Sequence, residues 1–368
     1  MVKSALARIL QRFPHCDFAC AYGSAVFKQR GYYANGSPAS RSSPSSPPML
    51  DIIIGVEDAE RWHNENMSRN PEDYTWPLSW FSGRGVKRFQ ETGGAHMVYH
   101  PYIPIRAGEG ERREESEDEG ERKQLQQRRK QQQKQQRQQP FTMLKYGVIS
   151  MCDLLDDLGS WTTLYCSGRL QKPVVLLSTT EQVNERLEDN RRSALLCAIL
   201  SLGPSFTERE LFHHITALSY AGDPRFLIGA ENKNKVRNIV DTNVDAFQEI
   251  YYPILSKLPF VNEVPSNNQN SNMTYERRRM SAEDINSIIS TLPSCLKSRL
   301  QLNAQDILAY GKGEPSSHEG VRSGIQAAVK QIVRNASTVQ SIKGLISSGP
   351  WRSARYLMAK WNKGFRSR

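Results

Sequence analysis

The first half of the chain carries its apolar residues in short runs that have the length of a strand. The run at 49–56 (MLDIIIGV) is apolar at nearly every position, which is typical of a strand buried on both faces. On this pattern we predict five strands. They cover residues 18–22, 49–56, 97–105, 141–150 and 174–177.

A helical repeat of apolar residues marks the start of the chain. Residues 2–13 place Leu6, Ile9 and Phe13 on one face, and we expect this helix to cover the neighbouring strands. The lack of acidic residues before Asp17 also fits the remnant of a targeting peptide, which is the alternative.

The pattern is helical again after residue 150. Apolar residues recur at helical spacing over 151–164, and 190–202 reads as an apolar helix. Thr207 and Glu210 have the spacing of a capping box, which predicts that a further helix begins there.

Three segments lack a hydrophobic period, and we predict that they are loops. Residues 36–48 are rich in Ser and Pro, and 263–280 are polar and rich in Asn. Residues 107–140 carry a run of acids, then bases among glutamines, which is typical of a solvated loop or a lone charged helix.

Composition allows a folded core and argues against a membrane span. The chain has 368 residues, enough for about two domains, and 38% of them are hydrophobic. No apolar run reaches the roughly 18 residues that a transmembrane helix needs. The six cysteines form no CxxC pair, so we expect free thiols in a reducing compartment and no zinc site of that type.

Positive charge is concentrated at the C-terminus. The net charge is +11, and the residues from Gly320 onward include ten Arg and Lys but no Asp or Glu. A helix beginning at Pro350 would combine this charge with an apolar stripe, so we expect an amphipathic helix over 350–366 on an anionic membrane surface. A helix docked on the protein and a helix that binds a calmodulin-like partner are the alternatives. The stripe consists of Trp351, Ala354, Met358, Trp361 and Phe365.

Candidate chemistry lies at the end of the first strand and in the second. Gly23 and Ser24 follow the first strand, and Asp51 lies within the next. Gly lets the backbone approach a triphosphate closely, the Ser hydroxyl can bind phosphate, and the carboxylate can hold Mg²⁺. This order is what a polymerase-beta-like nucleotidyltransferase needs, although Gly-Ser is also a common turn.

A resemblance makes this interpretation specific. The chain resembles the mitochondrial CDP-diacylglycerol synthases, also called the translocator assembly and maintenance proteins, in blocks of matching order and spacing. The resemblance covers almost the whole chain outside residues 33–48, 107–140 and about 262–320. The blocks are CAYGSAVFKQRGY (20–32), MLDIIIGVEDAERWHNENMSRNPEDY (49–74), KYGVIS (145–150), LYCSGRLQKPV (164–174), LSYAGDPR (218–225) and ENKNKVRNIV (231–240), with IVRNASTVQSIKG (332–344) in the tail.

The resemblance implies an α+β protein with a nucleotidyltransferase domain at 1–180, a helical winged-helix-like domain at 181–320 and a basic region at 321–368. It implies a Mg²⁺-dependent CTP:phosphatidate cytidylyltransferase that makes CDP-diacylglycerol and pyrophosphate for cardiolipin and phosphatidylglycerol synthesis. It also implies a peripheral protein on the matrix side of the mitochondrial inner membrane. A homo-oligomer is compatible with the sequence.

The resemblance also implies roles for individual residues. Asp51, Lys145 and Asp223 are the expected catalytic residues. The expected nucleotide- and phosphate-binding residues are Gly23, Ser24, His63, Asn66, Arg169, Lys172, Arg225, Glu231 and Lys235. Local chemistry leaves other interpretations open: a purely structural role for the helix with His63, and a simple turn for Gly222 to Arg225.

The chain departs from the wider superfamily at the second metal-binding acid. That acid usually lies two residues after the first, and here the position is Ile53. Glu57 shares the face by parity but lies roughly 20 Å along a straight strand. The candidates for a second ligand are Asp58, Asp157, Asp223 and Glu231.

Two other functions compete with lipid activation. A nucleotidyltransferase could act on another acceptor such as nucleic acid, but the aromatic stripe of the tail argues against that, and we expect no nucleic-acid partner. A non-enzymatic assembly factor for a membrane protein translocase would explain Ile53, whereas Gly23, Ser24 and Asp51 argue for an enzyme.

Overall fold

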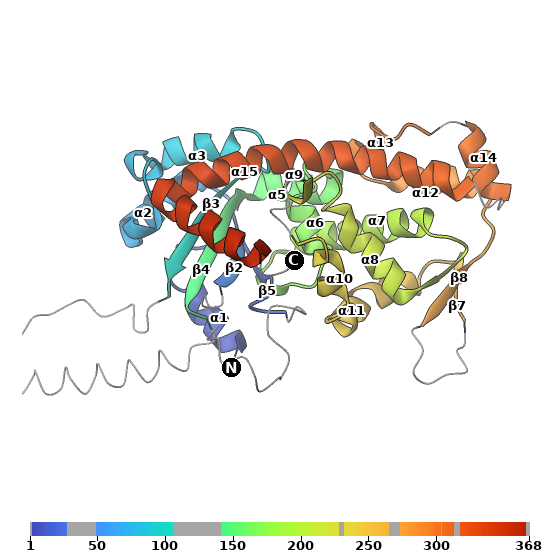
Figure 1. The fold of residues 1–368 in the computed structure, drawn as a ribbon, viewed down its shortest axis with the longest axis horizontal. Helices are drawn as coiled ribbons and strands as arrows, with labels where there is room; N and C mark the ends of the chain where they lie inside the picture. Colours follow the sequence, from blue (N-terminus) through green and yellow to red (C-terminus); the bar gives the residue numbers. More distant parts are fainter. Residues whose placement is uncertain are drawn as a thin grey trace, which may run out of the picture.

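The protein has a mixed α+β fold with a sheet part and a helical part side by side (Figure 1). The computed structural model describes the backbone of residues 2–27, 49–105, 141–227, 232–264, 273–302, 304–312 and 317–365, and most side chains up to residue 347. The loops predicted at 36–48 and 107–140 lie outside these residues.

The sheet part is built on five strands in the order β3-β4-β2-β1-β5. β2 and β4 pair in parallel, and the other neighbours pair antiparallel. The five predicted strands are therefore confirmed, and their ends differ from the prediction by two residues at most. Their bounds are β1 Phe18–Tyr22, β2 Met49–Val56, β3 Met97–Pro104, β4 Met143–Ser150 and β5 Val175–Ser178.

Both faces of this sheet are covered by helices. Because side chains alternate along a strand, Leu50 and Ile52 of β2 pack on one face with α1, α2 and α3, and Ile53 packs on the other with α5, α6 and the start of α7. Leu6 of α1 is fully buried, which confirms that the first helix covers the sheet. The bounds are α1 Val2–Leu10, α2 Ala59–Arg69, η1 Pro71–Asp73, η2 Leu78–Trp80, α3 Gly83–Glu91, α5 Met151–Ser160, α6 Cys166–Leu170 and α7 Glu181–Ser201.

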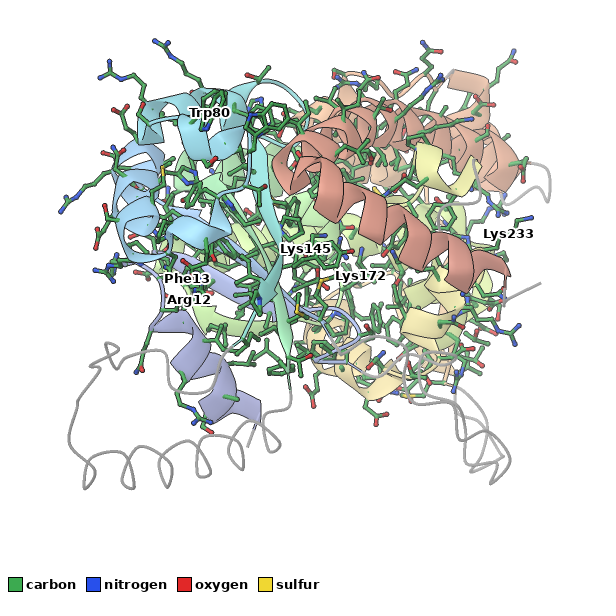
Figure 2. All side chains as sticks on the ribbon, turned by 60° about the vertical axis from the view of Figure 1, so that its left-hand side comes forward. Arg12, Phe13, Trp80, Lys145, Lys172 and Lys233 are labelled. Carbon is green, nitrogen blue, oxygen red and sulfur yellow. The ribbon has the colours of Figure 1, made fainter. Side chains whose placement is uncertain are left out.

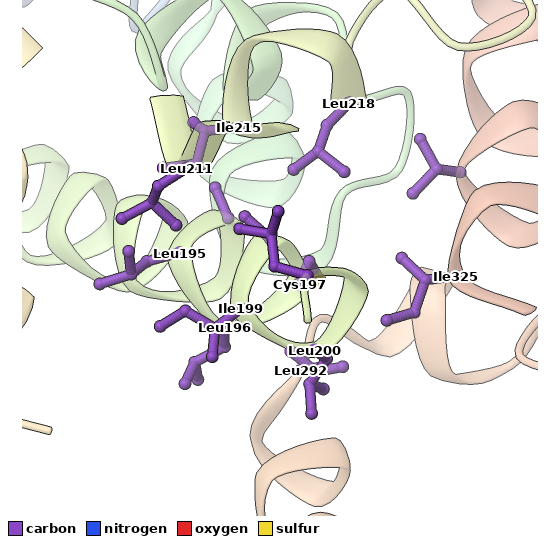
Figure 3. Packing of buried hydrophobic residues seen from close by; sticks show 14 of the residues in the cluster. Leu195, Leu196, Cys197, Ile199, Leu200, Leu211, Ile215, Leu218, Leu292 and Ile325 are labelled. Atoms are coloured by element: carbon purple, nitrogen blue, oxygen red, sulfur yellow. The ribbon is translucent and has the colours of Figure 1, made fainter. Parts of the chain in front are cut away.

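The helical part is built around the second half of α7. Figure 3 shows Leu196 and Leu200 of this helix among Leu211, Leu292 and other apolar side chains. The apolar segment 190–202 is thus the buried end of a longer helix, which begins after Thr180 caps it through the amide of Val183. The other helices here are α8 Glu208–Leu218, α9 Pro224–Leu227, α10 Lys235–Val240, α11 Val244–Leu255, α12 Ala282–Thr291, α13 Ser294–Lys297 and α14 Ala304–Lys312.

A small antiparallel sheet lies at the edge of the helical part, in the order β6-β8-β7. Its strands are β6 Ser205–Thr207, β7 Val261–Val264 and β8 Thr274–Arg277. The prediction of a loop throughout 263–280 is therefore wrong at 263–264, which belong to β7, and at 274–277, which form β8. β8 is short and polar, and what holds it is tertiary packing, such as the stacking of Tyr275 on Phe206.

One long helix, α15 Ser317–Phe365, connects the two parts. Val329 packs in the helical core, whereas the Gln340 side chain binds the backbone of β3 at the sheet edge. Near its C-terminal end α15 turns back across the molecule (Figure 1). The prediction that a helix begins at Pro350 is wrong, because Pro350 lies inside α15. Within the described residues, no helix combines the length and apolar character that a bilayer crossing requires.

Candidate active site

The register of the sheet brings three of the expected site residues together. Asp51 of β2 pairs with Lys145 of β4 on one side and with Tyr22 of β1 on the other. The Lys145 ammonium lies 3.7 Å from an Asp51 carboxylate oxygen. Gly23 follows Tyr22 directly, so its backbone lies beside the Asp51 carboxylate, and Ser24 continues the same turn.

Gly23 is required here on two grounds. Its φ of +85° is a left-handed conformation that other residues adopt only at a cost. A Cβ atom at this position would also lie 3.0 Å from Oδ2 of Asp51. The turn is closed by hydrogen bonds from the amides of Val26 and Phe27 to the Gly23 carbonyl, of 3.1 and 2.9 Å.

We expect Gly23→Ala to lower kcat/KM at least about tenfold without unfolding the protein. The left-handed backbone costs a residue with a Cβ about 1–2 kcal/mol, and the Asp51 carboxylate must shift slightly to make room for the methyl group. Gly203→Ala is the matched control, since the Cβ added there meets only a backbone oxygen at 3.8 Å. Steady-state kinetics with CTP, the nucleotide that the family resemblance implies, measures the change, and equal kinetics of the two variants would contradict the close approach.

Tyrosine rings connect this pair to an arginine on α6. The Lys145 ammonium lies 4.5 Å from the centre of the Tyr99 ring, and the Arg169 guanidinium lies 4.4 Å from the centre of the Tyr22 ring. The two phenol oxygens are 3.5 Å apart. Burial, followed by the nearby Asp51 carboxylate, raises the pKa of Tyr22 above its ordinary value, so the phenol stays neutral.

Two lysines extend this cluster to the helical part. The ammonium groups of Lys172 and Lys235 lie 5.0 and 5.2 Å from the centre of the Tyr220 ring. Lys172 also donates to the Ser219 hydroxyl at 2.7 Å and to the Gly168 carbonyl. Burial, then the positive charges of Arg169 and Lys235, lower the pKa of Lys172 well below its ordinary value. Figure 2 shows Lys145 and Lys172 in the middle of the molecule.

Asp157 holds the segment that leads from α5 to α6, the helix that carries Arg169. Its carboxylate accepts hydrogen bonds from the backbone amides of Thr163, Leu164 and Ser167, each at 2.8 Å, and from three hydroxyl groups of the same segment. It thereby holds the turn between α5 and α6, where Leu164 has a φ of 52°. The helix predicted to run on to Leu164 ends at Ser160 for this reason. Asp157 therefore positions α6 and has no oxygen left for a metal.

Of the three other candidates for a second metal ligand, Asp58 lies elsewhere, Asp223 is already bound, and Glu231 is outside the described residues. Asp58 lies beyond the opposite end of β2 from Asp51 and caps α2 through the amide of Arg61. The buried Asp223 carboxylate is bound by the backbone amide and the guanidinium of Arg225. Glu231 lies outside the described residues. In the part of the chain that the structure describes, no three His, Cys, Asp or Glu side chains form a metal-binding group.

His63 and Asn66 lie on the other face of the sheet. His63 contacts the Tyr74 hydroxyl at 2.9 Å and Gln90 at 3.1 Å, and Asn66 donates to the hydroxyls of Tyr74 and Tyr146. Burial lowers the pKa of His63 to about 4, so the ring is neutral. Both residues are completely buried, and they stabilise the contact of α2 with the sheet on the side that Asp51 does not face.

Sequence reasoning missed the aromatic and hydroxyl groups between the cations. Tyr22, Tyr99, Tyr220 and Ser219 separate and orient Lys145, Arg169, Lys172 and Lys235. Their place in the sequence could have indicated a role in the site, because Tyr22 directly precedes Gly23 and the pair Ser219-Tyr220 precedes the turn at Gly222. The resulting arrangement has a half-buried carboxylate, Asp51, beside a glycine turn and several cations, which suits a bound polyphosphate.

Comparisons with known proteins agree with this chemistry. The family model described as phosphatidate cytidylyltransferase, mitochondrial, matches residues 6–363. A mouse protein of that name is 33% identical over 370 residues, which cover 97% of this chain and 94% of the mouse protein. The fission yeast protein of that name is 30% identical over 380 residues, covering 100% of this chain and 85% of its own. The human protein is 30% identical, with 96% and 70% covered.

Proposed function

Because this chain belongs to the family of mitochondrial phosphatidate cytidylyltransferases, we propose that it joins CTP to phosphatidic acid and releases pyrophosphate. The product is CDP-diacylglycerol. The observation that carries the proposal is the close approach of Gly23 to Asp51, beside Lys145 and the cations of α6 and α10.

The reaction exchanges one phosphorus–oxygen bond for another. A phosphate oxygen of phosphatidic acid attacks the α-phosphorus of CTP, and the bond from that phosphorus to the bridging oxygen breaks. Pyrophosphate leaves with the electron pair. Negative charge spreads over the phosphoryl oxygens during transfer, so cations fixed before the reaction lower the barrier.

The described residues divide this work by position. The turn at Gly23 and Ser24 receives the triphosphate, because a side chain at Gly23 would occupy the space beside Asp51. Lys145, Arg169, Lys172 and Lys235 neutralise phosphate charge. Arg225 is fixed by its ion pair with Asp223 and would bind a phosphate group as well.

Asp51 fits a magnesium ion. Mg²⁺ is commonly held by one or two carboxylates, with water and substrate phosphates completing its shell, so a single protein carboxylate suffices. Bound there, the ion would polarise the phosphoryl oxygens and shield their charge. Ile53 therefore does not exclude catalysis, since the triphosphate itself can supply the remaining ligands.

The proposal extends to the two domains and to the location of the protein in the cell. The mixed sheet fits a polymerase-beta-like nucleotidyltransferase domain over 1–180, and the helices with the small β6-β8-β7 sheet fit a winged-helix-like domain over 181–320. The relatives are named mitochondrial, which supports a mitochondrial location. Within the mitochondrion, the proposal is a peripheral protein on the matrix side of the inner membrane that serves cardiolipin synthesis. The basic tail 321–368, with its stripe over 350–366, would bind the anionic bilayer.

A direct assay tests the function. The purified chain is mixed with CTP, Mg²⁺ and vesicles that contain phosphatidic acid, and lipid product and pyrophosphate are measured together. We expect equal amounts of both, and little product when ATP, GTP or UTP replaces CTP. Pyrophosphate without CDP-diacylglycerol, or no turnover at all, would contradict the proposal.

Binding of CTP is expected to draw a proton onto Lys172. Burial and neighbouring cations lower the pKa of this amine, and a bound triphosphate raises that pKa again, so binding takes up a proton in the pH range between the two pKa values. CTP affinity should therefore fall as the pH rises. Calorimetric titration in two buffers with different ionisation enthalpies measures the proton uptake. The Lys172→Arg variant stays charged and should show no proton uptake. An uptake equal to that of the wild type would refute the assignment.

A further inference from the structure

An exposed aromatic surface lies between α2 and α3. Trp80 and Trp76 are 81% and 55% exposed, and Phe81 is also exposed. The two indole rings meet edge to face with their centres 6.5 Å apart. We call residues 76–81 the aromatic loop. Large aromatic side chains are normally covered in a folded protein, so such a cluster marks a surface that binds something.

The apolar surface continues onto α15. Ile342, which is 54% exposed, is followed by the exposed Leu345 and Ile346 at helical spacing. The Thr75 hydroxyl donates to the Ser347 carbonyl at 2.7 Å, so the aromatic loop is attached to α15 next to Ile346. Figure 1 shows α3 beside this end of α15.

The opposite side of α15 fixes which way these residues face. Gln340 contacts the Ala95 amide at 3.4 Å and the Met97 carbonyl at 3.2 Å. Lys343 donates to the carbonyls of Gln90 at 2.6 Å and Gly93 at 3.3 Å. Because these polar side chains bind the protein, Ile342, Leu345 and Ile346 are held outward as a rigid face.

The charge around this surface is positive. α3 carries Arg84, Lys87 and Arg88; Arg84 pairs with Glu60 of α2 and Lys87 with Glu91, so the exposed Arg88 is the excess positive charge there. Residues 320–347 of α15 carry Arg and Lys but no acid. An apolar centre with a basic rim complements an anionic bilayer, where indole rings lie at the level of the head groups. Phosphatidic acid is such an anionic lipid.

We propose that the aromatic loop and the exposed face at Ile342, Leu345 and Ile346 form a membrane-docking surface that enters the head-group region of an anionic bilayer. The inference deepens the proposed function, since it concerns how the protein approaches its lipid substrate. It concerns a different surface from the apolar stripe of 350–366. One amphipathic helix fixes depth but leaves the protein free to rotate about it, and a second contact on the sheet part fixes orientation.

A variant pair separates this role from folding. Trp76→Ser/Trp80→Ser removes two exposed side chains, and Leu308→Ser is the control because Leu308 is 53% exposed on α14, at the other end of the molecule. Flotation is measured with phosphatidylcholine vesicles with and without phosphatidic acid. We expect the double variant to lose binding to the anionic vesicles at least about tenfold, whereas Leu308→Ser binds as the wild type does.

Activity provides an independent measurement. The rate on vesicle-borne phosphatidic acid should fall in the double variant, and the rate on a soluble short-chain phosphatidic acid should not. Equal loss on both substrates, or unchanged flotation, would overturn the proposal and leave this surface to a protein partner. Flotation needs no turnover, so its result stands even if the proposed activity fails.

Quenching by brominated lipids locates the indole rings directly. In the full chain with Trp351→Phe and Trp361→Phe, the exposed tryptophans are Trp76 and Trp80, since Trp62 and Trp161 are buried. Vesicles with brominated acyl chains should quench their emission. Emission that is the same with brominated and ordinary vesicles would contradict insertion.

Discussion

Asp51→Asn is expected to lower the rate of CDP-diacylglycerol formation at least about a thousandfold while the protein stays folded. The amide keeps the shape of the side chain but removes the charge that faces Lys145 at 3.7 Å and would hold the metal beside Gly23. Without that charge, the triphosphate and the ion lose their fixed point on the sheet. The loss should appear in kcat rather than in KM alone, because the charge matters most in the transition state.

The control for this variant lies beyond the other end of the same strand. Asp58→Asn also removes one carboxylate charge, but it only weakens the cap of α2, so its activity should stay within about twofold of the wild type. Single-turnover kinetics measures the chemical step, and vesicle flotation shows whether membrane binding is intact. Wild-type turnover by Asp51→Asn would remove the basis of the proposed site.

Asp157→Ala is expected to destabilise the protein by about 3–5 kcal/mol. The substitution removes an acceptor that is 2% exposed and leaves the buried amides of Thr163, Leu164 and Ser167 without a partner. The turn at Leu164 then has nothing to hold its left-handed backbone. Urea unfolding followed by circular dichroism measures the free energy.

The neighbouring residue gives the matched control. Asp156 is on the same helix and exposed, so Asp156→Ala should change the unfolding free energy by less than about 0.5 kcal/mol. If Asp157→Ala were as stable as Asp156→Ala, the hydrogen bonds to the carboxylate would be worth little. CTP affinity measured on the folded fraction shows in addition whether Arg169 has moved.

The sequence predicts the sheet well because the strands are buried. The run at 49–56 is apolar on both faces, and helices do cover both faces. β8 escaped prediction because it is short and polar and depends on contacts such as Tyr275 with Phe206. The start of α15 was missed because an apparent start signal, Pro350, lies within a helix that tertiary contacts hold together.

The residues of the candidate site also differ in how far the sequence predicts their position. Order along the chain was enough to suggest Gly23 with Asp51, since consecutive strands commonly pair and the sheet register then places the two side by side. His63 and Asn66 lie in segments that resemble the family just as clearly, yet they lie on the face of the sheet opposite to Asp51. The face on which a helix such as α2 packs is decided by tertiary contacts and cannot be read from the order of the residues. The same limit applies to Asp157, whose role appears only when the amides around it are seen.

The covering of β3 has a consequence for how the chain folds during synthesis. β3 is an edge strand, and α15 lies along it through Gln340, more than 200 residues later in the sequence. A nascent chain therefore carries an open edge at β3 until the segment around Gln340 has been made, and open edges invite pairing with other chains. Ribosome-bound intermediates that end before Gln340 should therefore aggregate more readily than those that extend past it, because only the longer ones can cover the β3 edge.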